Sequence, residues 1–169
     1  EKQIKHGITG VNDSEEVKLT LEQLKEIEKI RKSNIRWLDE PWIFKEITPL
    51  VMEANRAANW NFQFTAHEKA QFTIYGSEQF YDWHIDSSDK EFKDGNTRKL
   101  SVTLSLNDDT EYEGGYLEID NRNNFHQKNI HKLEMIRNAG SLVVFPSFLY
   151  HRVTPVTKGT RYSLVLWIT

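Results

Sequence analysis

The hydrophobic pattern near the start of the chain has the spacing of an amphipathic helix. Thr20 stands three residues before Gln23, which is the arrangement of a capping box. Behind it, apolar residues recur every three positions: Leu21, Leu24, Ile27 and Ile30. This periodicity predicts a helix that runs from Thr20 to about Lys32.

A second helix is expected from Pro41, because proline is tolerated in the first helical turn. Apolar residues at helical spacing are expected to line its buried side: Ile43, Ile47, Leu50, Val51, Ala54 and Ala57. Pro49 lies inside this pattern, so we expect a kink or a break there. Together the two helices predict a helical support over residues 1–59.

From Trp60 onward the pattern changes to short runs rich in β-branched and aromatic residues, separated by glycines. Eight runs have the pattern of strands: 62–64, 70–75, 80–85, 99–106, 116–119, 141–145, 150–153 and 161–168. They predict an α+β fold, mainly β, in which a jelly roll of two sheets carries the N-terminal helices packed on one sheet. We expect one domain, with residues 60–169 as its β-rich core and the polar stretch 121–129 as a flexible loop.

Composition narrows the function classes. The 169 residues fit a single domain, and 22 basic against 25 acidic residues leave no broad basic surface for nucleic acid. The chain has no cysteine, so a transition metal would have to be held by histidine and carboxylate. No apolar run is long enough for a membrane span, and no secretory signal pattern opens the sequence. We therefore expect a cytoplasmic protein with neither a membrane nor a nucleic-acid partner.

One histidine and one carboxylate stand two residues apart in a predicted strand. His84 and Asp86 would share a face of that strand, among aromatic and apolar neighbours where a carboxylate is costly to bury without a cation. His151 has a similarly apolar setting in another predicted strand. The other histidines lie in polar segments and are expected at the surface: His6, His67, His126 and His131. Two histidines and one carboxylate form the facial triad of Fe(II) oxygenases, whereas the alternative for His84 is a hydrogen bond to its neighbour.

The last predicted strand begins with an arginine. Alternation places Arg161, Ser163, Val165 and Trp167 on one face of this strand. An arginine that heads an otherwise apolar run requires an anion, and a small dicarboxylate would meet that requirement. Ser163 would add a hydroxyl donor. The alternative is a structural salt bridge at the start of the strand.

Residues 72–169 resemble the 2-oxoglutarate- and Fe(II)-dependent oxygenases, and among them the prolyl 4-hydroxylase-like branch. Tyr75 and Tyr81 stand nine and three residues before His84, as in that branch. Five further segments follow in the family's order: RKLS at 98–101, EGGYLE at 113–118, GSLVVFP at 140–146, HRVTPV at 151–156 and GTRYSL at 159–164. The resemblance implies a double-stranded β-helix.

The resemblance also implies a role for each of several residues. The implied iron ligands are His84, Asp86 and His151. The implied 2-oxoglutarate residues are Tyr75, Leu117, Arg161 and Ser163, of which Arg161 would pair with the distal carboxylate and Leu117 would pack against the co-substrate. The implied substrate-side residues are Tyr81, Arg98 and Trp167. Two departures stand out, because Gly76 follows Tyr75 at once and because collagen-type relatives use lysine where this chain has Arg161.

The activity implied by the resemblance is hydroxylation of a C–H bond that consumes O₂ and 2-oxoglutarate, with ascorbate as a candidate reductant. A prolyl residue in a peptide or protein is the leading substrate, and a free amino acid or another small molecule also fits. Two other readings stay open. One is a non-catalytic jelly-roll metal-binding module, and the other is a nucleic-acid demethylase, which the acidic balance disfavours.

Overall fold

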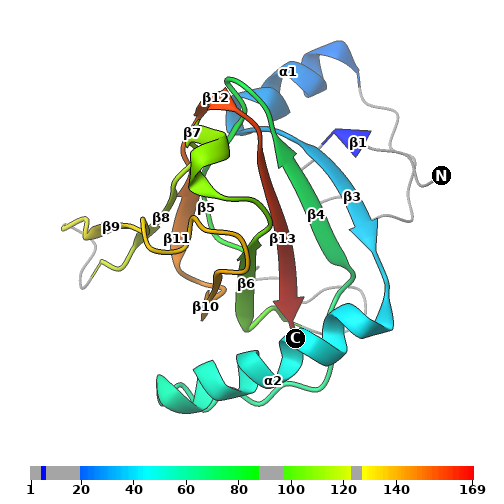
Figure 1. Cartoon of the computed structure of the whole chain (residues 1–169), viewed down its shortest axis with the longest axis vertical. Coiled ribbons are helices and arrows are strands. Elements are labelled where there is room, and N and C mark those ends of the chain that lie inside the picture. The colour runs from blue at the N-terminus through cyan, green and yellow to red at the C-terminus, as the bar shows by residue number, and fades with distance from the viewer. Residues whose placement is uncertain (1–4, 7–19, 88–96, 123–126) are drawn as a thin grey trace.

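Two antiparallel sheets face each other in the computed structural model, which describes residues 5–6, 20–87, 97–122 and 127–169 (Figure 1). The six-stranded sheet contains, in order, β1 (Lys5–His6), β3 (Asn34–Leu38), β4 (Ala70–Tyr75), β13 (Arg161–Ile168), β6 (Leu100–Ser105) and β10 (Leu142–Pro146). The five-stranded sheet contains β2 (Arg31–Lys32), β5 (Phe80–His84), β11 (Tyr150–Val153), β8 (Leu117–Asp120) and β9 (Ile130–Lys132). A two-stranded ribbon pairs β12 (Val156–Gly159) with β7 (Tyr112–Gly114), which follows the short 3₁₀ helix η1 (Asp109–Glu111). The expected jelly roll is confirmed.

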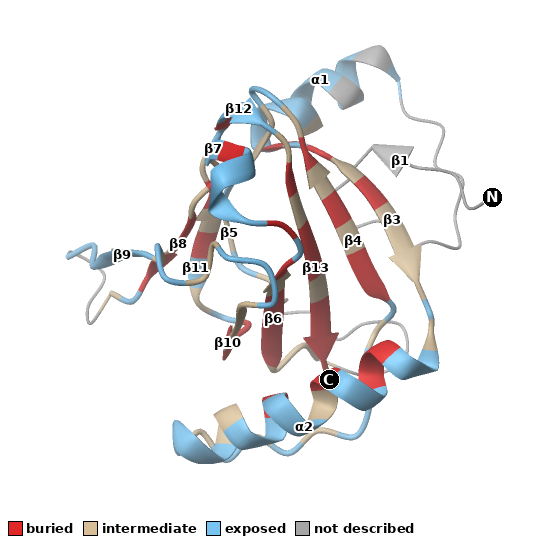
Figure 2. Cartoon of the chain, in the orientation of Figure 1, coloured by how far each residue is buried: buried red, intermediate tan, exposed pale blue. Residues whose placement is uncertain are grey.

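Helix α2 (Pro41–Ala57) covers the outer face of the six-stranded sheet. Its buried residues are Ile43, Phe44, Ile47 and Val51. They pack against alternate residues of three strands: Ala70, Leu100, Val102, Leu164, Leu166 and Ile168. Because side chains alternate across a strand, the intervening residues face the other sheet. Figure 2 shows the resulting buried bands along β4, β6 and β13.

The expectations for α2 are met only in part. Of the kink or break expected at Pro49, a break does not occur, because the helix continues to Ala57. Pro49 is exposed, so the backbone carbonyl that loses its N–H partner can be hydrated. Leu50 and Ala57 were expected on the buried side, yet both are exposed, and Phe44 is buried instead.

Helix α1 (Leu21–Ile30) begins with the predicted capping box. The Gln23 backbone N–H donates to Thr20 Oγ1 at 3.2 Å, and the Thr20 N–H donates to Gln23 Oε1 at 2.9 Å. The helix ends at Ile30 rather than near Lys32, because Arg31 and Lys32 form β2 and pair with β5. Thus α1 adjoins β2 and β5 of the five-stranded sheet, whereas α2 alone packs on the six-stranded sheet.

The strand expected at 62–64 is not formed. The side chain of Asn55 bonds both backbone groups of Phe62, donating to its carbonyl at 2.9 Å and accepting from its N–H at 3.1 Å. The side chain of Asn55 thereby makes the hydrogen bonds to the Phe62 backbone that a neighbouring strand would otherwise make. Strand β3 was not predicted, although it pairs with β4 along its whole length. The expected loop at 121–129 lies partly outside the described residues, and Ile130–Lys132 beyond it form β9.

Within the described part of the chain, neither helix combines the length and the apolar character that a membrane crossing requires.

Candidate functional site

Three potential metal ligands converge between the two sheets. His84 ends β5 and His151 lies directly opposite it on β11, while Asp86 follows two residues after His84. One ligand atom from each lies within 4.8 Å of the others. Their side chains are only 12%, 7% and 7% exposed for His84, Asp86 and His151, so the carboxylate is largely removed from water.

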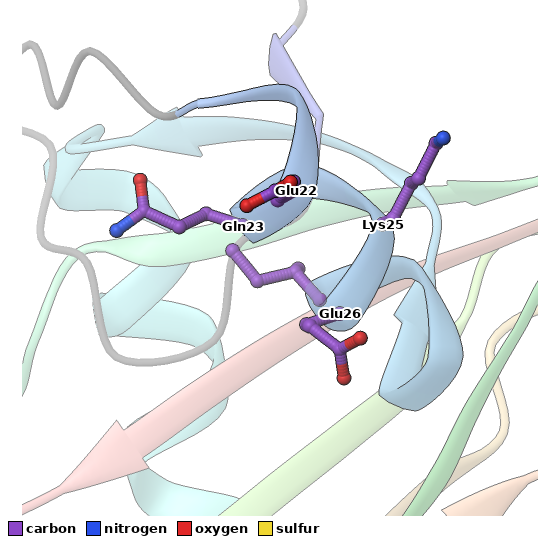
Figure 3. A pocket seen from close by; sticks show the side chains of 5 residues that line it. Glu22, Gln23, Lys25 and Glu26 are labelled. Atoms are coloured by element: carbon purple, nitrogen blue, oxygen red, sulfur yellow. The ribbon is translucent and has the colours of Figure 1, made fainter.

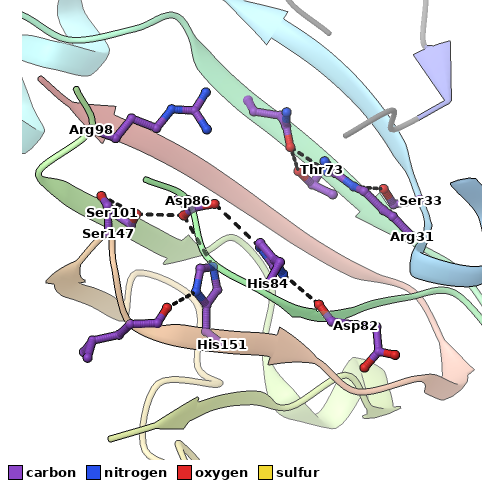
Figure 4. Close-up of polar contacts among 12 residues, drawn as sticks. Arg31, Ser33, Thr73, Asp82, His84, Asp86, Arg98, Ser101, Ser147 and His151 are labelled. Carbon is purple, nitrogen blue, oxygen red and sulfur yellow. Dashed lines mark hydrogen bonds and ion pairs between the residues drawn. The ribbon is translucent and has the colours of Figure 1, made fainter. Parts of the chain in front are cut away.

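Backbone carbonyls orient both histidine rings (Figure 4). Nδ1 of His84 lies 2.7 Å from the carbonyl of Asp82, and Nδ1 of His151 lies 2.9 Å from the carbonyl of Leu149. A carbonyl oxygen only accepts hydrogen bonds, so each Nδ1 carries the proton and donates it. Each Nε2 then has a free lone pair in the neutral ring and faces Asp86, at 3.6 Å for His84 and 3.4 Å for His151. This is the arrangement that fixes metal-binding histidines.

Ser101 holds the carboxylate of Asp86, and Ser147 contacts Ser101. Ser101 Oγ donates to Asp86 Oδ2 at 2.7 Å and lies 2.9 Å from Ser147 Oγ. The backbone N–H of Asp86 donates to the carbonyl of Ser147 at 2.9 Å. Figure 4 shows the two serines on one side of Asp86 and His84 on the other. Since Ser101 and Ser147 are fully buried, their hydroxyl groups restrict how the carboxylate can turn.

The three groups shift one another's pKa values. Burial alone would raise the pKa of Asp86, but His151 and His84 outweigh it and hold that pKa well below its usual 3.8. Burial lowers the pKa of His84. Burial would also lower the pKa of His151, but the carboxylate of Asp86 outweighs it and raises that pKa. An ionised, buried carboxylate between two imidazoles is a donor set suited to a divalent metal such as Fe(II).

A β-bulge places Tyr81 beside His84. His151 lies opposite His84 and Val153 lies opposite Tyr81, so β5 contains one more residue than β11 over this interval. Without the bulge, residues three apart would point to opposite faces of the strand. With it, the ring of Tyr81 stacks on that of His84 at a centroid distance of 3.5 Å. The substrate-side position expected for Tyr81 is therefore next to the candidate metal ligands.

A narrow cavity of about 30 Å³ joins these ligands to the start of β13. The cavity brings together nearly all residues that the sequence predicts: Tyr75, Tyr81, His84, Asp86, Leu117, His151, Arg161, Ser163 and Trp167. Leu117 on β8 is the register partner of Val153 on β11, two residues after His151, and both residues line the cavity.

Arg161 is buried, and no carboxylate of the described residues balances its charge. It is 3% exposed, its Nη1 donates to Ser163 Oγ at 3.3 Å, and its guanidinium lies 5.5 Å from the ring of Tyr75. Among the described residues no carboxylate lies within ion-pair distance of it. The predicted alternative, a structural salt bridge, therefore has no partner in this part of the chain. A carboxylate placed in the cavity would supply the charge that Arg161 lacks.

Gly115 allows Arg161 to lie where it does. Its φ is +61°, and a Cβ atom there would lie 2.9 Å from Val156 Cγ2 and 3.0 Å from Arg161 Cδ. A side chain at this position would be strained and would press on the arginine.

The loop after Tyr75, where Gly76 departs from the family's pattern, is a tight turn closed by a 3.0 Å bond from the Gln79 N–H to the Gly76 carbonyl.

Arg98 stands apart from the other expected residues. Its Nε and Nη2 donate to the two carboxylate oxygens of Glu68 at 2.5 and 2.6 Å, and its guanidinium stacks 3.9 Å from the ring of Trp167. Arg98 is not among the residues that line the cavity. Trp167 lines it, and its buried indole N–H has no hydrogen-bond partner among the described residues.

Sequence reasoning missed several polar residues that line the cavity or contact its residues: Arg31, Gln71, Thr103, Ser101 and Ser147. A signal for three of them was present. In β4 and β6, Gln71, Ser101 and Thr103 alternate with apolar residues, and they are 3%, 0% and 7% exposed. Buried polar residues on one face of a strand need polar partners, so such a face is expected to line a polar site or cavity. Arg31 carried no such signal, because it continued the helical pattern of α1.

The remaining histidines take no part in the site as far as they are described. His67 and His131 are exposed, as expected, and the ring of His67 stacks on Phe44 at 3.6 Å. The side chain of His6 and all of His126 lie outside the described residues.

A second hollow lies along α1 and has no comparable chemistry. Glu22, Gln23, Lys25 and Glu26 line it, and Figure 3 shows their side chains spreading outward rather than converging. Glu26 is already paired with Lys29 at 2.5 Å. Groups that diverge on an exposed helix do not form a ligand site, so we assign it no role.

Known proteins share the strand-rich part of this chain. Residues 70–169 match the family model of the 2OG-Fe(II) oxygenase superfamily. A PKHD-type hydroxylase of Shewanella oneidensis is 41% identical over 98 residues, and PKHD-type hydroxylase PSPA7_5129 of Pseudomonas paraeruginosa is 34% identical over 99 residues. Each match covers 57% of this chain and 41% of the relative. The chain thus spans about two fifths of the length of the curated relatives it matches.

Solved structures share the fold. A prolyl-4-hydroxylase of Pseudomonas putida superposes with a TM-score of 0.61 at 27% identity, covering 83% of this chain and 73% of that one. A prolyl hydroxylase of Trichoplax adhaerens, solved with a hypoxia inducible factor peptide fragment, gives a TM-score of 0.68 at 21% identity over 98% of this chain and 70% of that one. At that lower identity the likeness is one of fold alone.

Proposed function

We propose that this chain, which belongs to the 2OG-Fe(II) oxygenase superfamily, hydroxylates a C–H bond, with a prolyl residue of a peptide or protein as the leading substrate. His84, Asp86 and His151 would hold Fe(II), and Arg161 would hold 2-oxoglutarate. The observation that carries the proposal is that two groups line the same cavity. One is a buried cluster of three potential metal ligands, and the other is a buried arginine without a carboxylate partner among the described residues.

When bound, Fe(II) and 2-oxoglutarate supply the oxidising chemistry, in which O₂ gives one oxygen to succinate and one to the substrate while CO₂ is released. The chain's own residues bind and orient. Nε2 of each histidine and the carboxylate of Asp86 would bind the metal, and the hydrogen bond from Ser101 to Asp86 Oδ2 would fix the orientation of that carboxylate. Three protein ligands leave three positions on a six-coordinate metal for co-substrate and O₂.

Arg161 would fix the far end of the co-substrate. Its fork of N–H groups suits a carboxylate, and the hydroxyl of Ser163 lies 3.3 Å from it. Leu117 and Val153 line the same cavity, where apolar side chains exclude water. A co-substrate held at both ends would present its keto-acid end to the metal in one orientation.

The rings that face the cavity support a prolyl substrate. Tyr81 stacks on His84, and Trp167 lines the cavity with an indole N–H that has no acceptor among the described residues and could donate to a carbonyl oxygen. Aromatic walls with a polar tip suit the apolar ring and flanking amide of proline. The prolyl-4-hydroxylase of Pseudomonas putida and the PKHD-type hydroxylases add support by similarity. Arg98 does not line the cavity, so it would act on the substrate only indirectly, by stacking on the ring of Trp167.

The test is a turnover screen. The protein is loaded with Fe(II) without oxygen and then given O₂, 2-oxoglutarate and either prolyl peptides or free amino acids, with and without ascorbate. We expect succinate release together with a gain of one oxygen on a prolyl peptide, and neither with Asp86→Ala. Oxygen gain on a free amino acid alone would replace the prolyl assignment and leave the iron and 2-oxoglutarate assignments intact. A cytoplasmic location stays a prediction from the sequence.

A further inference from the structure

A second arginine is buried in the same cavity. Arg31 of β2 is 5% exposed and lines the cavity together with Gln71 and Tyr81. Its Nε donates to Ser33 Oγ at 2.9 Å and its Nη2 donates to Gln71 Oε1 at 2.6 Å. Figure 4 shows Arg31 beside Ser33 and Thr73. Ser33 and Gln71 are neutral, so they satisfy hydrogen bonds without balancing the charge.

The charge of Arg31 has no carboxylate within ion-pair distance among the described residues, and its Nη1 has no acceptor there. In the same part of the chain its guanidinium also lies 4.5 Å from the ring of Tyr81. Burying an unpaired cation costs several kcal/mol by rough estimate, so a buried arginine with neutral partners points to a charge that arrives with a ligand.

The co-substrate would not provide that charge. Arg161 lies opposite Tyr75 at one end of β4, whereas Arg31 reaches Gln71, four residues earlier on the same face. Four residues of extended strand span about 13 Å. The two carboxylates of 2-oxoglutarate, together with Asp86, would balance Fe(II) and Arg161. The charge of Arg31 would then remain unbalanced in the complete co-substrate complex.

Arg31 stands on the substrate side of the metal ligands. Tyr81 is the link, because its ring contacts the guanidinium of Arg31 and stacks on His84 at 3.5 Å. Arg31 and Tyr81 are register partners across β2 and β5. A group bound to Arg31 would therefore lie next to the metal, on the wall where the oxidised carbon has to be presented.

We propose that Arg31 binds a carboxylate of the primary substrate, close to the carbon that is hydroxylated. The inference rests on the proposed function and narrows the substrate class to molecules that have a carboxylate near the carbon that is hydroxylated. Such a carboxylate belongs to a free amino acid, or to an acidic residue or C-terminus beside a prolyl residue. Arg31 is thus a specificity-determining residue that would favour anionic over neutral forms of one substrate.

The binding test needs no knowledge of the natural substrate. Wild-type protein is saturated with Mn(II) and 2-oxoglutarate, which occupies Arg161, and its melting temperature is followed during titration with sodium acetate or, at equal ionic strength, sodium chloride. Acetate should raise the melting temperature by at least about 2 °C, since a ligand that binds the folded state stabilises it. Arg31→Gln should abolish this rise, and Arg31→Lys should keep part of it.

Arg56→Gln is the matched control. Arg56 lies on the exposed side of α2, paired with Glu53, so this variant makes the same change in net charge away from the cavity. It should keep the full acetate effect. Equal stabilisation by acetate and chloride in wild type, or an undiminished acetate effect in Arg31→Gln, would overturn the proposal and leave Arg31 as a tie between β2 and β4. If Arg31→Gln does not fold, the comparison of acetate with chloride in wild-type protein still tests the proposal, because equal stabilisation by the two salts would overturn it.

Turnover identifies the source of the carboxylate. Oxygen gain is compared for L-proline and L-prolinamide, and for a prolyl peptide with a neighbouring aspartate and its asparagine counterpart. We expect wild type to prefer the anionic member of one pair at least about tenfold, and Arg31→Gln to lose that preference; no preference in either pair would contradict the proposal. The two proposals fail separately, because 2-oxoglutarate binding is measured first. Its absence would remove the proposed function, while an Arg31-dependent acetate effect would still establish the anion site.

Discussion

The two faces of the six-stranded sheet are both buried, but they are built from opposite chemistry. On the outer face, Leu100, Val102 and Leu166 are 0–1% exposed and pack against α2. On the inner face, Thr73, Ser101 and Ser163 are equally buried, at 0–1%, yet each contacts a polar side chain, and Ser163 lines the cavity. Burial alone therefore does not identify the hydrophobic core of this protein.

The difference arises from the two-residue period of a strand. Ser163 and Leu164 are neighbours in β13, but Ser163 lies beside Arg161 on the cavity face, whereas Leu164 packs with the α2 cluster on the other face. Outer-face residues contribute transfer free energy and tight packing. Inner-face residues contribute hydrogen bonds and an uncompensated positive charge, which stabilise a ligand rather than the fold. Substitutions one position apart should thus damage different properties.

The largest effect is expected at Arg161. Arg161→Ala should raise the 2-oxoglutarate concentration needed for half-maximal turnover by roughly 10²–10³-fold, because truncation leaves a bound carboxylate buried and unpaired. Arg161→Lys should be tolerated in part, since the charge remains but the fork geometry is lost. Metal affinity, measured in parallel by calorimetry, should change little. An unaltered 2-oxoglutarate requirement in Arg161→Ala would make Arg161 merely structural.

The outer face should show the reverse behaviour. Leu166→Ala should lower the free energy of unfolding by about 2–5 kcal/mol, because it opens a cavity against α2. Denaturant titration measures this loss, and the 2-oxoglutarate requirement of the protein that remains folded should stay within about twofold of wild type. A large change in that requirement would show that the two faces are not independent.

Ser101 should affect the metal through Asp86. Ser101→Ala removes the 2.7 Å hydrogen bond to Asp86 Oδ2 and should weaken Fe(II) binding by about 10–100-fold, as for other groups that orient a ligand. The requirement for 2-oxoglutarate, once the metal is saturating, should hardly change. Ser105→Ala is the matched control, since Ser105 lies on the same face of β6 but donates to the Ile136 carbonyl instead. Equal loss of metal affinity in both variants would argue against a positioning role for Ser101.

The smallest expected effect is on pH dependence. Because Asp86 raises the pKa of His151 above 6.5, metal-free protein keeps His151 protonated to a higher pH than a free imidazole. That protonation stabilises the metal-free fold below pH 6.5 and is lost as the pH rises through the folded-state pKa. The metal requires a neutral ring, so its affinity should fall on acidification. Calorimetry in two buffers of different ionisation enthalpy should detect proton release near pH 6.5; no release would mean that His151 is already neutral.

The sequence predicted the strands of the jelly roll well where alternation was strong. The runs at 70–75, 150–153 and 161–168 agree with β4, β11 and β13 residue for residue. It failed where a non-local partner decided the outcome. Arg31 left the helical pattern because β5 offered it a strand partner, and Phe62 remained outside the sheets because Asn55 satisfied its backbone.

The candidate site divides in the same way. Residues of distinctive chemistry, such as His84, Asp86 and Arg161, could be selected from the sequence because a charge in an apolar strand requires a partner. Ser147 could not, because it lies in the turn after β10 and only the fold brings its hydroxyl within 2.9 Å of that of Ser101. The bulge that turns Tyr81 toward His84 was equally invisible, since alternation places the two on opposite faces.

One titration tests the central claim most directly. Fe(II) is added without oxygen to wild-type protein and to Asp86→Ala, and 2-oxoglutarate is then titrated into each by calorimetry. Wild type should bind one Fe(II) and then one 2-oxoglutarate, with little 2-oxoglutarate bound when the metal is omitted, and Asp86→Ala should bind neither tightly while remaining folded. Wild-type binding of both by the Asp86→Ala variant would contradict the assignment of His84, Asp86 and His151 as the metal site.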